Sequence, residues 1–386
     1  MNKFLSEFDS PPNRVDTSSL KWEKYADSDI IPLWVADMDF KSPQSVIDQA
    51  KISADHGNFG YGCPPKGLVE LLISRSADLY DWEINPEWIV WLPGMVCALN
   101  VCCRALLEDS SQAIIQTPIY PPFLTASRNF NLPLVKVPLV LEGSRFTIDF
   151  NSLATLKTNP GDLFMLCHPH NPVGTLFNKD ELLSLTNWIV ERDLYLCSDE
   201  IHCDLILGKD LHHISPASLT SKVAEKTITL MAPSKTFNIA GFGCSFAIIS
   251  NSELRLKFRR AMRGIVPDPP AMGFLLADAA YREGEPWRLS LIDYLQGNRE
   301  LAMIELAGMD GLVPHSPEAT YLLWIDARTL PVDNPHEFFE KNGVGLSDGA
   351  DFDAPGFLRL NLGCARKLLT EALARMSNAC KKLRTT

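Results

Sequence analysis

The sequence lacks the features that mark several protein classes. It has 386 residues and a net charge of −11, with no block of like charges, which argues against a nucleic-acid-binding surface. No run of about 18 apolar residues is present, so no membrane span is expected. Met1–Pro12 has no apolar core of a secretory signal, so we expect no signal peptide and a cytoplasmic location.

Metal-binding and disulfide patterns are also missing. The ten cysteines form no C-x-x-C pair and no cluster with histidine, and several lie in apolar runs, such as Cys167, Cys197 and Cys244. This usage is typical of buried free thiols in a reducing compartment and predicts no metal site.

Short apolar runs alternate with longer mixed segments between residues 88 and 250, without internal repeats or low-complexity tracts. The runs are rich in Ile, Val, Leu and Phe and lack strict alternation, as in strands covered on both faces. The pattern predicts an α/β fold with a mostly parallel, seven-stranded sheet flanked by helices such as Lys179–Glu191. The predicted strands are Trp88–Leu92, Ala113–Gln116, Leu134–Val137, Leu163–Cys167, Leu194–Ser198, Thr227–Met231 and Ser245–Ile249.

The pattern changes after about residue 285, where Glu285–Ala307 predicts one long helix. We predict a large domain over residues 46–285 and a smaller α+β domain over residues 286–386. The N-terminal segment, residues 1–45, is expected to pack with the smaller domain.

Two charged residues stand at predicted strand ends, where parallel sheets bind ligands. Lys235 follows the run that ends at Met231, and partial burial would free its amine for imine formation. Asp199 closes the run Leu194–Ser198 and could bond a protonated pyridine nitrogen. A surface loop lysine and a helix N-cap are the ordinary alternatives.

Further candidates follow the same pattern. Asn171 lies in an Asn-Pro turn, Tyr120 precedes Pro-Pro, and the backbone of Met95 and Val96 could bind a phosphate at a helix start. Arg359 interrupts an apolar run and matches a substrate carboxylate. A structural turn, a loop anchor and an ion pair remain alternatives, but the fold would deliver all these residues to one cleft.

These motifs resemble those of the pyridoxal 5′-phosphate (PLP)-dependent fold-type I enzymes, the aspartate aminotransferase superfamily. Within it, the chain is similar to the cystathionine β-lyase (C–S lyase) branch that includes the bacterial MalY and PatB proteins. The resemblance extends over residues 13–366 and is carried by Pro32–Phe40, Phe59–Tyr61, Tyr120–Phe123, Pro169–Pro172, Ser198–Asp204, Ser234–Gly241 and Phe357–Asn361.

The resemblance implies a role for each core candidate. Lys235 would form the Schiff base with PLP, Asp199 would pair with the pyridinium and Asn171 would bind the phenolic oxygen. Tyr120 would stack on the ring, and Arg359 would clamp the substrate α-carboxylate.

It also implies roles for surrounding residues. Ser234 would hold the phosphate with the Met95 and Val96 backbone, and His202 and Ala36 would contribute to the cofactor and substrate sites respectively. Tyr61 would reach the phosphate of a neighbouring subunit, which implies a homodimer with shared active sites.

Three positions depart from relatives of this type. His202 stands where aminotransferases often have a tyrosine that touches the phenolic oxygen. Gly243 stands where many aminotransferases have a phosphate-binding arginine, a loss shared with the lyase branch. Thr175 stands where the branch would have arginine, so a side chain expected near the cleft has changed.

The sequence thus predicts a lyase that eliminates a thiol from L-cystathionine or a related cysteine S-conjugate. A class I/II aminotransferase would use the same residues, and a PLP-binding regulator without catalysis is the third possibility. The expected partners are a small-molecule amino-acid substrate and a second copy of the chain, with no nucleic acid and no membrane.

Overall fold

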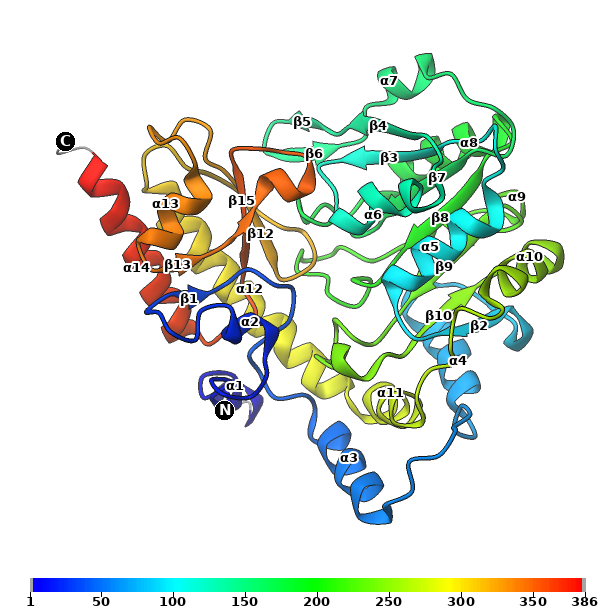
Figure 1. Ribbon diagram of the computed structural model, residues 1–386, viewed down its shortest axis with the longest axis horizontal. Coiled ribbons are helices and arrows are strands. Elements are labelled where there is room, and N and C mark those ends of the chain that lie inside the picture. Colours follow the sequence, from blue (N-terminus) through cyan, green and yellow to red (C-terminus); the bar gives the residue numbers. More distant parts are fainter. Residues whose placement is uncertain (1–2, 384–386) are drawn as a thin grey trace.

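The computed structural model describes residues 3–383. Its larger sheet contains seven strands in the order β2, β10, β9, β8, β7, β3, β4, and all run parallel except β10 (Figure 1). Each coincides, within one or two residues, with a predicted apolar run, so the predicted α/β sheet is confirmed. In spatial order the strands are Ile89–Leu92, Ser245–Ile248, Thr227–Met231, Tyr195–Asp199, Leu163–Cys167, Ala113–Thr117 and Leu134–Pro138.

Both faces of this sheet are buried, because successive strand residues point to opposite sides. Ile115 and Met165 pack with α5 (Met95–Leu106) and α10 (Ser252–Met262). Their neighbours Ile114 and Phe164 pack on the other face with α8 (Lys179–Glu191). This two-sided burial explains why the strands lack strict alternation.

The start of α8 shows how local sequence sets an element boundary. The Asn178 side chain accepts hydrogen bonds from the backbone N–H groups of Asp180 and Glu181. Glu181 in turn accepts from the Asn178 backbone N–H, which completes a capping box.

A second, four-stranded antiparallel sheet has the order β11, β12, β15, β14. Figure 1 shows α12 running from beside α11 (Ala271–Glu283) into this smaller lobe, whose helices pack against the sheet. Its elements are α12 (Glu285–Ala307), β11 (Val313–His315), β12 (Leu322–Asp326), α13 (Pro335–Lys341), β13 (Val344–Gly345), β14 (Ser347–Asp348), η5 (Gly349–Phe352), β15 (Phe357–Asn361) and α14 (Arg366–Leu383).

The N-terminal segment lies on the smaller lobe. Strand β1 (Ile31–Pro32) pairs in parallel with β13, and α1 (Lys3–Phe8) packs on α12. The domain boundaries at residues 45 and 285 stay predictions.

The remaining elements complete the large lobe, apart from the short α2 of the N-terminal segment. They are α2 (Leu20–Glu23), α3 (Gln44–His56), α4 (Leu68–Tyr80), η1 (Pro86–Trp88), α6 (Pro121–Ala126), η2 (Arg128–Phe130), β5 (Val140–Glu142), β6 (Arg145–Thr147), α7 (Phe150–Thr155), η3 (Pro216–Ser218), α9 (Ser221–Ala224), η4 (Ala240–Phe242) and α11 (Ala271–Glu283).

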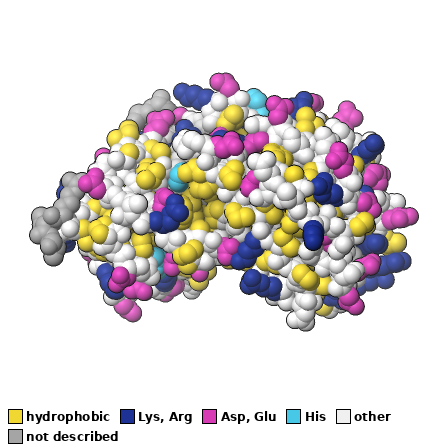
Figure 2. Space-filling model, turned by 90° about the horizontal axis from the view of Figure 1, so that it is seen from above, with side chains coloured by type: hydrophobic (Ala, Val, Ile, Leu, Met, Phe, Trp, Pro, Cys, Tyr) yellow, Lys and Arg dark blue, Asp and Glu magenta, His cyan; other side chains and the backbone are white. Residues whose placement is uncertain are grey.

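The surface is mixed in charge. On the face shown in Figure 2, acidic and basic side chains are interspersed, and hydrophobic side chains gather in a hollow near the middle. Between residues 3 and 383, no helix is long and apolar enough to cross a membrane.

Candidate active site

The carboxyl ends of the large sheet carry the predicted site residues into one cavity of about 180 Å³, here called the lysine pocket. Asp199 ends β8, and Asn171, Tyr120 and Lys235 follow β7, β3 and β9. Parallel strands bring their carboxyl ends to the same edge, so residues scattered along the chain meet there. The other predicted residues that line the pocket are Ala36, Met95, Val96, His202 and Ser234.

Lys235 is buried among these groups. Its Nζ donates a hydrogen bond to the main-chain carbonyl of Ala36, with an N···O distance of 2.7 Å. Burial lowers the pKa of the Lys235 amine to about 8, and the positive charge of Arg359 acts in the same direction. About a tenth of this amine is therefore neutral and nucleophilic at pH 7, far more than for an exposed lysine.

Burial shifts the pKa of Asp199 in the opposite direction, because the charged form of a carboxyl group is the deprotonated one. Its carboxylate accepts a hydrogen bond of 3.1 Å from the Ile201 N–H, and it forms no ion pair with any residue between 3 and 383. Burial raises the pKa of Asp199 to about 7. A buried carboxyl group of this kind is suited to share a proton with a ligand nitrogen.

Arg359 links the lysine pocket to the smaller lobe. Its Nη1 donates to the Asn171 side-chain oxygen over 3.0 Å, and its Nη2 donates to the Trp34 carbonyl over 2.9 Å. The guanidinium lies over the Phe352 ring, 4.6 Å from its centroid. Burial lowers the pKa of Arg359 to about 10, and its Nε has no hydrogen-bond partner within the described chain.

His202 and Tyr120 are held in less polar surroundings. Burial lowers the pKa of His202 to about 3, so the ring is neutral, and its buried Nδ1 has no partner among the described residues. Burial also raises the pKa of Tyr120, which keeps its hydroxyl protonated. Both side chains can therefore make neutral contacts with a ligand.

The phosphate end predicted for the lysine pocket consists of backbone and one hydroxyl. The pocket is lined there by Ser234 and by Met95 and Val96 at the start of α5, which has twelve residues. The free N–H groups of a helix start favour an anion. Gly243, which lines the same pocket, contributes no side chain.

Two asparagines that we did not select from the sequence, the half-buried Asn238 and the buried Asn361, fix the N-terminal segment against this pocket. The Asn238 amide donates to the carbonyls of Met38 and Phe40, and the Asn361 amide donates to those of Val35 and Asp37. Both asparagines lie in sequence motifs that carry the family resemblance. Hydrophobic periodicity, however, does not distinguish them from ordinary turn residues.

Tyr321 is a third residue that sequence reasoning missed. Its hydroxyl donates to the Ala36 carbonyl over 3.0 Å, the same oxygen that accepts from Lys235. The Ala36 carbonyl is therefore positioned from the smaller lobe as well as by its own segment. The signal for this role is absent from the sequence, because Tyr321 precedes a strand of ordinary apolar residues.

A second cavity, here called the arginine cavity, lies on the other side of Lys235 and has a volume of about 410 Å³. It shares Ala36, Tyr120 and Lys235 with the lysine pocket and includes Arg359. A molecule held by Arg359 would thus lie in the arginine cavity, which the lysine side chain also lines.

Comparison with known proteins identifies the family. Residues 28–376 match the family described as aminotransferase class I and II. The chain belongs to this family.

Individual relatives cover nearly the whole chain. The cystathionine β-lyase PatB of Bacillus subtilis is 34% identical, over 96% of this chain and 99% of its own. The crystal structure titled OvoB is 44% identical, with a TM-score of 0.94, over 97% of this chain and 98% of its own. Cystalysin from Treponema denticola, whose structure contains PLP, is 32% identical with a TM-score of 0.92, over 97% and 99% of the two chains.

The Thr175 side chain does not line the cleft, near which we expected it from the sequence. It is buried, its hydroxyl donates to the Phe146 carbonyl over 3.0 Å, and it lines neither the lysine pocket nor the arginine cavity. The expectation of a changed side chain near the cleft was therefore wrong. The chain turns at Gly174, with φ of 73°, and directs residue 175 toward β6.

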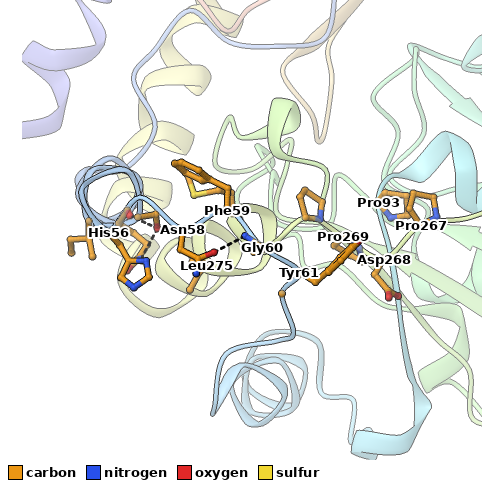
Figure 3. Close-up of a pocket in the computed structure, with 17 residues that line it drawn as sticks. His56, Asn58, Phe59, Gly60, Tyr61, Pro93, Pro267, Asp268, Pro269 and Leu275 are labelled. Atoms are coloured by element: carbon orange, nitrogen blue, oxygen red, sulfur yellow. Dashed lines mark hydrogen bonds between the residues drawn. The ribbon is translucent and has the colours of Figure 1, made fainter.

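Tyr61 lies outside the lysine pocket of its own chain. Its side chain is fully exposed and lines a groove of about 1050 Å³, here called the Tyr61 groove, between the end of α3 and the start of α11. Figure 3 shows Tyr61 beside Pro269 and Asp268, with Phe59 on the same loop. Two adjacent exposed aromatic side chains are unusual on a surface that contacts only water.

Proposed function

We propose that the protein is a PLP-dependent C–S β-lyase, which converts L-cystathionine or a related cysteine S-conjugate to a thiol, pyruvate and ammonia. The observation that carries this proposal is the arrangement of Lys235, Asp199 and Arg359 at the junction of two cavities. The relationship to PatB supports the choice of elimination over other reactions of the family.

The residues present fit PLP. The lysine pocket offers a buried amine with a lowered pKa, a buried carboxyl group with a raised pKa and a histidine nitrogen without a partner. Lys235 would hold the cofactor covalently, Asp199 would pair with its ring nitrogen, and Asn171 and His202 would face its phenolic oxygen. Tyr120 would stack on the ring, and Ser234 with the Met95 and Val96 N–H groups would bind the phosphate.

When bound, PLP supplies an electron sink for negative charge at the substrate α-carbon. Arg359 would bind the substrate α-carboxylate through a charge-assisted fork. Once the substrate amine has replaced Lys235 on the cofactor, the released neutral Lys235 amine would remove the Cα proton as general base, held toward the site by the Ala36 carbonyl.

The complete reaction consumes one water molecule for each substrate molecule. The Cα proton passes to Lys235, the Cβ–S bond breaks, and its electron pair leaves with sulfur, which takes up a proton. Water then hydrolyses the remaining three-carbon fragment to pyruvate and ammonia.

A class I/II aminotransferase is the second candidate, since the family description includes that activity. It would use the same Lys235 and Asp199 but would deliver the proton to a different carbon. A non-catalytic regulator would need neither the lowered Lys235 pKa nor the Arg359 guanidinium in the adjoining cavity.

One assay separates these candidates. The purified protein is mixed with L-cystathionine, and pyruvate, free thiol and the amino-acceptor product are measured separately. Equal amounts of pyruvate and thiol without an added oxo acid support the lyase. Product formation only when an oxo acid is added identifies an aminotransferase, and no product from either reaction supports the regulator.

We also propose a homodimer in which Tyr61 completes the partner's site. Tyr61 cannot act in the lysine pocket of its own chain as it stands, and Gly243 leaves the phosphate end without a side-chain cation. An exposed loop with Phe59 and Tyr61, beside a long groove, suits contact with a second copy.

Mixing two inactive variants tests this arrangement. In mixed dimers of Lys235→Ala and Tyr61→Ala chains, shared sites would leave one site with both residues intact and restore part of the activity. If Tyr61 acts within its own chain, each site of the mixed dimer carries a lesion and no activity returns.

The cysteine arrangement supports a cytoplasmic location. None of the ten cysteines forms a disulfide within the described residues, and eight of them are buried. Such usage is typical of reducing compartments.

A further inference from the structure

The arginine cavity has an unequal distribution of charge, and this difference points to the chemistry of the leaving thiol. Its charged or titratable lining groups are the basic residues Lys24 and Arg359, the imidazole of His336 and the acidic residues Asp348 and Asp351, besides the base Lys235. Lys24 and His336 both face Glu340, and their charges lower the pKa of that carboxyl group. Whether the cavity attracts a cation or an anion depends on which of these charges are already paired.

Both basic groups have partners. Lys24 Nζ lies 3.1 Å from a carboxylate oxygen of Glu340, which neutralises it, and it rests over the Trp34 ring at 5.2 Å. Arg359 is assigned to the substrate α-carboxylate in the proposed function. When the substrate is bound, neither the Arg359 guanidinium nor the Lys24 ammonium is therefore available to bind an anionic group on the leaving thiol.

The two acidic groups have fewer hydrogen-bond and ion-pair partners than the basic groups. The Asp351 carboxylate is exposed on η5 and makes no ion pair or hydrogen bond with the described part of the chain, although its negative charge acts on Arg359 and, against the larger effect of burial, raises the pKa of that guanidinium. Asp348 accepts one hydrogen bond, over 2.9 Å from the Ala350 N–H, through a single oxygen. With the bases paired, the cavity presents a net negative charge.

The walls between these charges are largely apolar. Trp34, Leu346 and Phe352 line the cavity, and Phe352 lies directly after Asp351. A leaving group that fits this lining has an apolar body and a cationic end.

We propose that the arginine cavity selects cysteine S-conjugates whose leaving thiol carries a cationic group, with Asp351 as its principal partner and Asp348 as a second. This inference rests on the proposed function for the orientation of the substrate. Asp351 and Asp348 are then specificity-determining residues, while Lys235 and Arg359 act on the part common to all cysteine conjugates.

Three probes that differ only in the leaving thiol test the charge preference. They are S-aminoethyl-L-cysteine with a cationic thiol, S-propyl-L-cysteine with a neutral thiol and S-carboxyethyl-L-cysteine with an anionic thiol. Binding is measured by calorimetry on the Lys235→Ala protein loaded with PLP, which cannot remove the Cα proton. Pyruvate formation is measured in parallel on the holoenzyme that retains Lys235.

We expect the cationic probe to bind about fivefold more tightly than the neutral probe, as for a partly exposed ion pair. In the Lys235→Ala protein, the additional change Asp351→Asn should remove this preference without changing the affinity for the neutral probe. The change Asp351→Glu, which keeps the negative charge, should retain much of the preference. Asp353→Asn is the matched control, because Asp353 lies two residues away, pairs with Lys136 and does not line the cavity.

The outcomes separate the two proposals. Equal binding of cationic and neutral probes, tighter binding of the anionic probe, or an Asp351→Asn effect equal for all three overturns the charge preference. An intact, Asp351-dependent preference without pyruvate from any probe supports the cavity assignment and rejects the lyase reaction instead.

Discussion

The lysine pocket and the arginine cavity meet at Lys235 but are built differently. The lysine pocket is formed almost entirely by residues at the ends of strands of one sheet, each next to its own strand in sequence. The arginine cavity combines the N-terminal segment, the loop after β3 and the region from α13 to β15. A single sheet edge can supply the common chemistry, while specificity comes from segments that meet only after folding.

Lys235→Ala should have the largest effect, because Lys235 belongs to both regions. We expect turnover to fall by about a thousandfold or more, since no other amine lies in the lysine pocket to act as base. Pyruvate release measures turnover, and circular dichroism checks that the fold is retained. Residual turnover within tenfold of the unchanged protein would assign the base to another residue.

Asp199→Asn should affect the lysine pocket alone. The amide cannot stabilise a protonated ring nitrogen, so kcat should fall by about a hundredfold or more. Asp162→Asn is the control, because Asp162 is equally buried but lies before β7, at the opposite edge of the sheet. If both variants lose kcat equally, the effect of Asp199 is structural.

Arg359→Ala should weaken the binding of the substrate that spans the two regions. Loss of a charge-assisted fork costs about 1.5–3 kcal/mol for ligands with an α-carboxylate. Binding of the corresponding amines, which lack that carboxylate, should change little. Equal losses for the two ligand classes in a calorimetric titration would rule out the clamp.

The pH dependence of cofactor attachment should report the Lys235 amine. Its pKa is lowered to about 8, so the reactive neutral form increases as pH rises through that value. The rate at which apoprotein takes up PLP, followed by visible absorbance, should be about tenfold lower at one pH unit below this pKa than at its plateau. A rate that is flat across this range, or falls with rising pH, contradicts the neutral-amine assignment.

Of these variants, Tyr321→Phe should reduce kcat the least. It removes one neutral hydrogen bond to the Ala36 carbonyl, worth about 0.5–1.5 kcal/mol, so kcat should fall by no more than about tenfold, with little change in KM. Tyr294→Phe is the control, because this tyrosine is also buried but its hydroxyl contacts Asp9 and the Arg366 backbone, away from Lys235. An equal loss of kcat in both variants would contradict a positioning role for Tyr321.

The sequence by itself determined the sheet and most of the lysine pocket. Doubly covered parallel strands need continuous apolar runs, and their carboxyl ends fall together whichever loops connect them. For that reason Asp199, Asn171 and Lys235 could be named as candidates from their positions, and their combination and the family resemblance then gave each a predicted role.

Only the tertiary structure decided the arginine cavity and the direction of individual side chains. Asp351 and Lys24 are more than 300 residues apart and have no pattern that joins them. The inward or outward direction of Thr175 depends on the turn at Gly174, and the role of Tyr321 depends on a carbonyl from the N-terminal segment. Local periodicity records which face of an element is buried, whereas these contacts depend on how separate elements pack, and that information is spread over the whole chain.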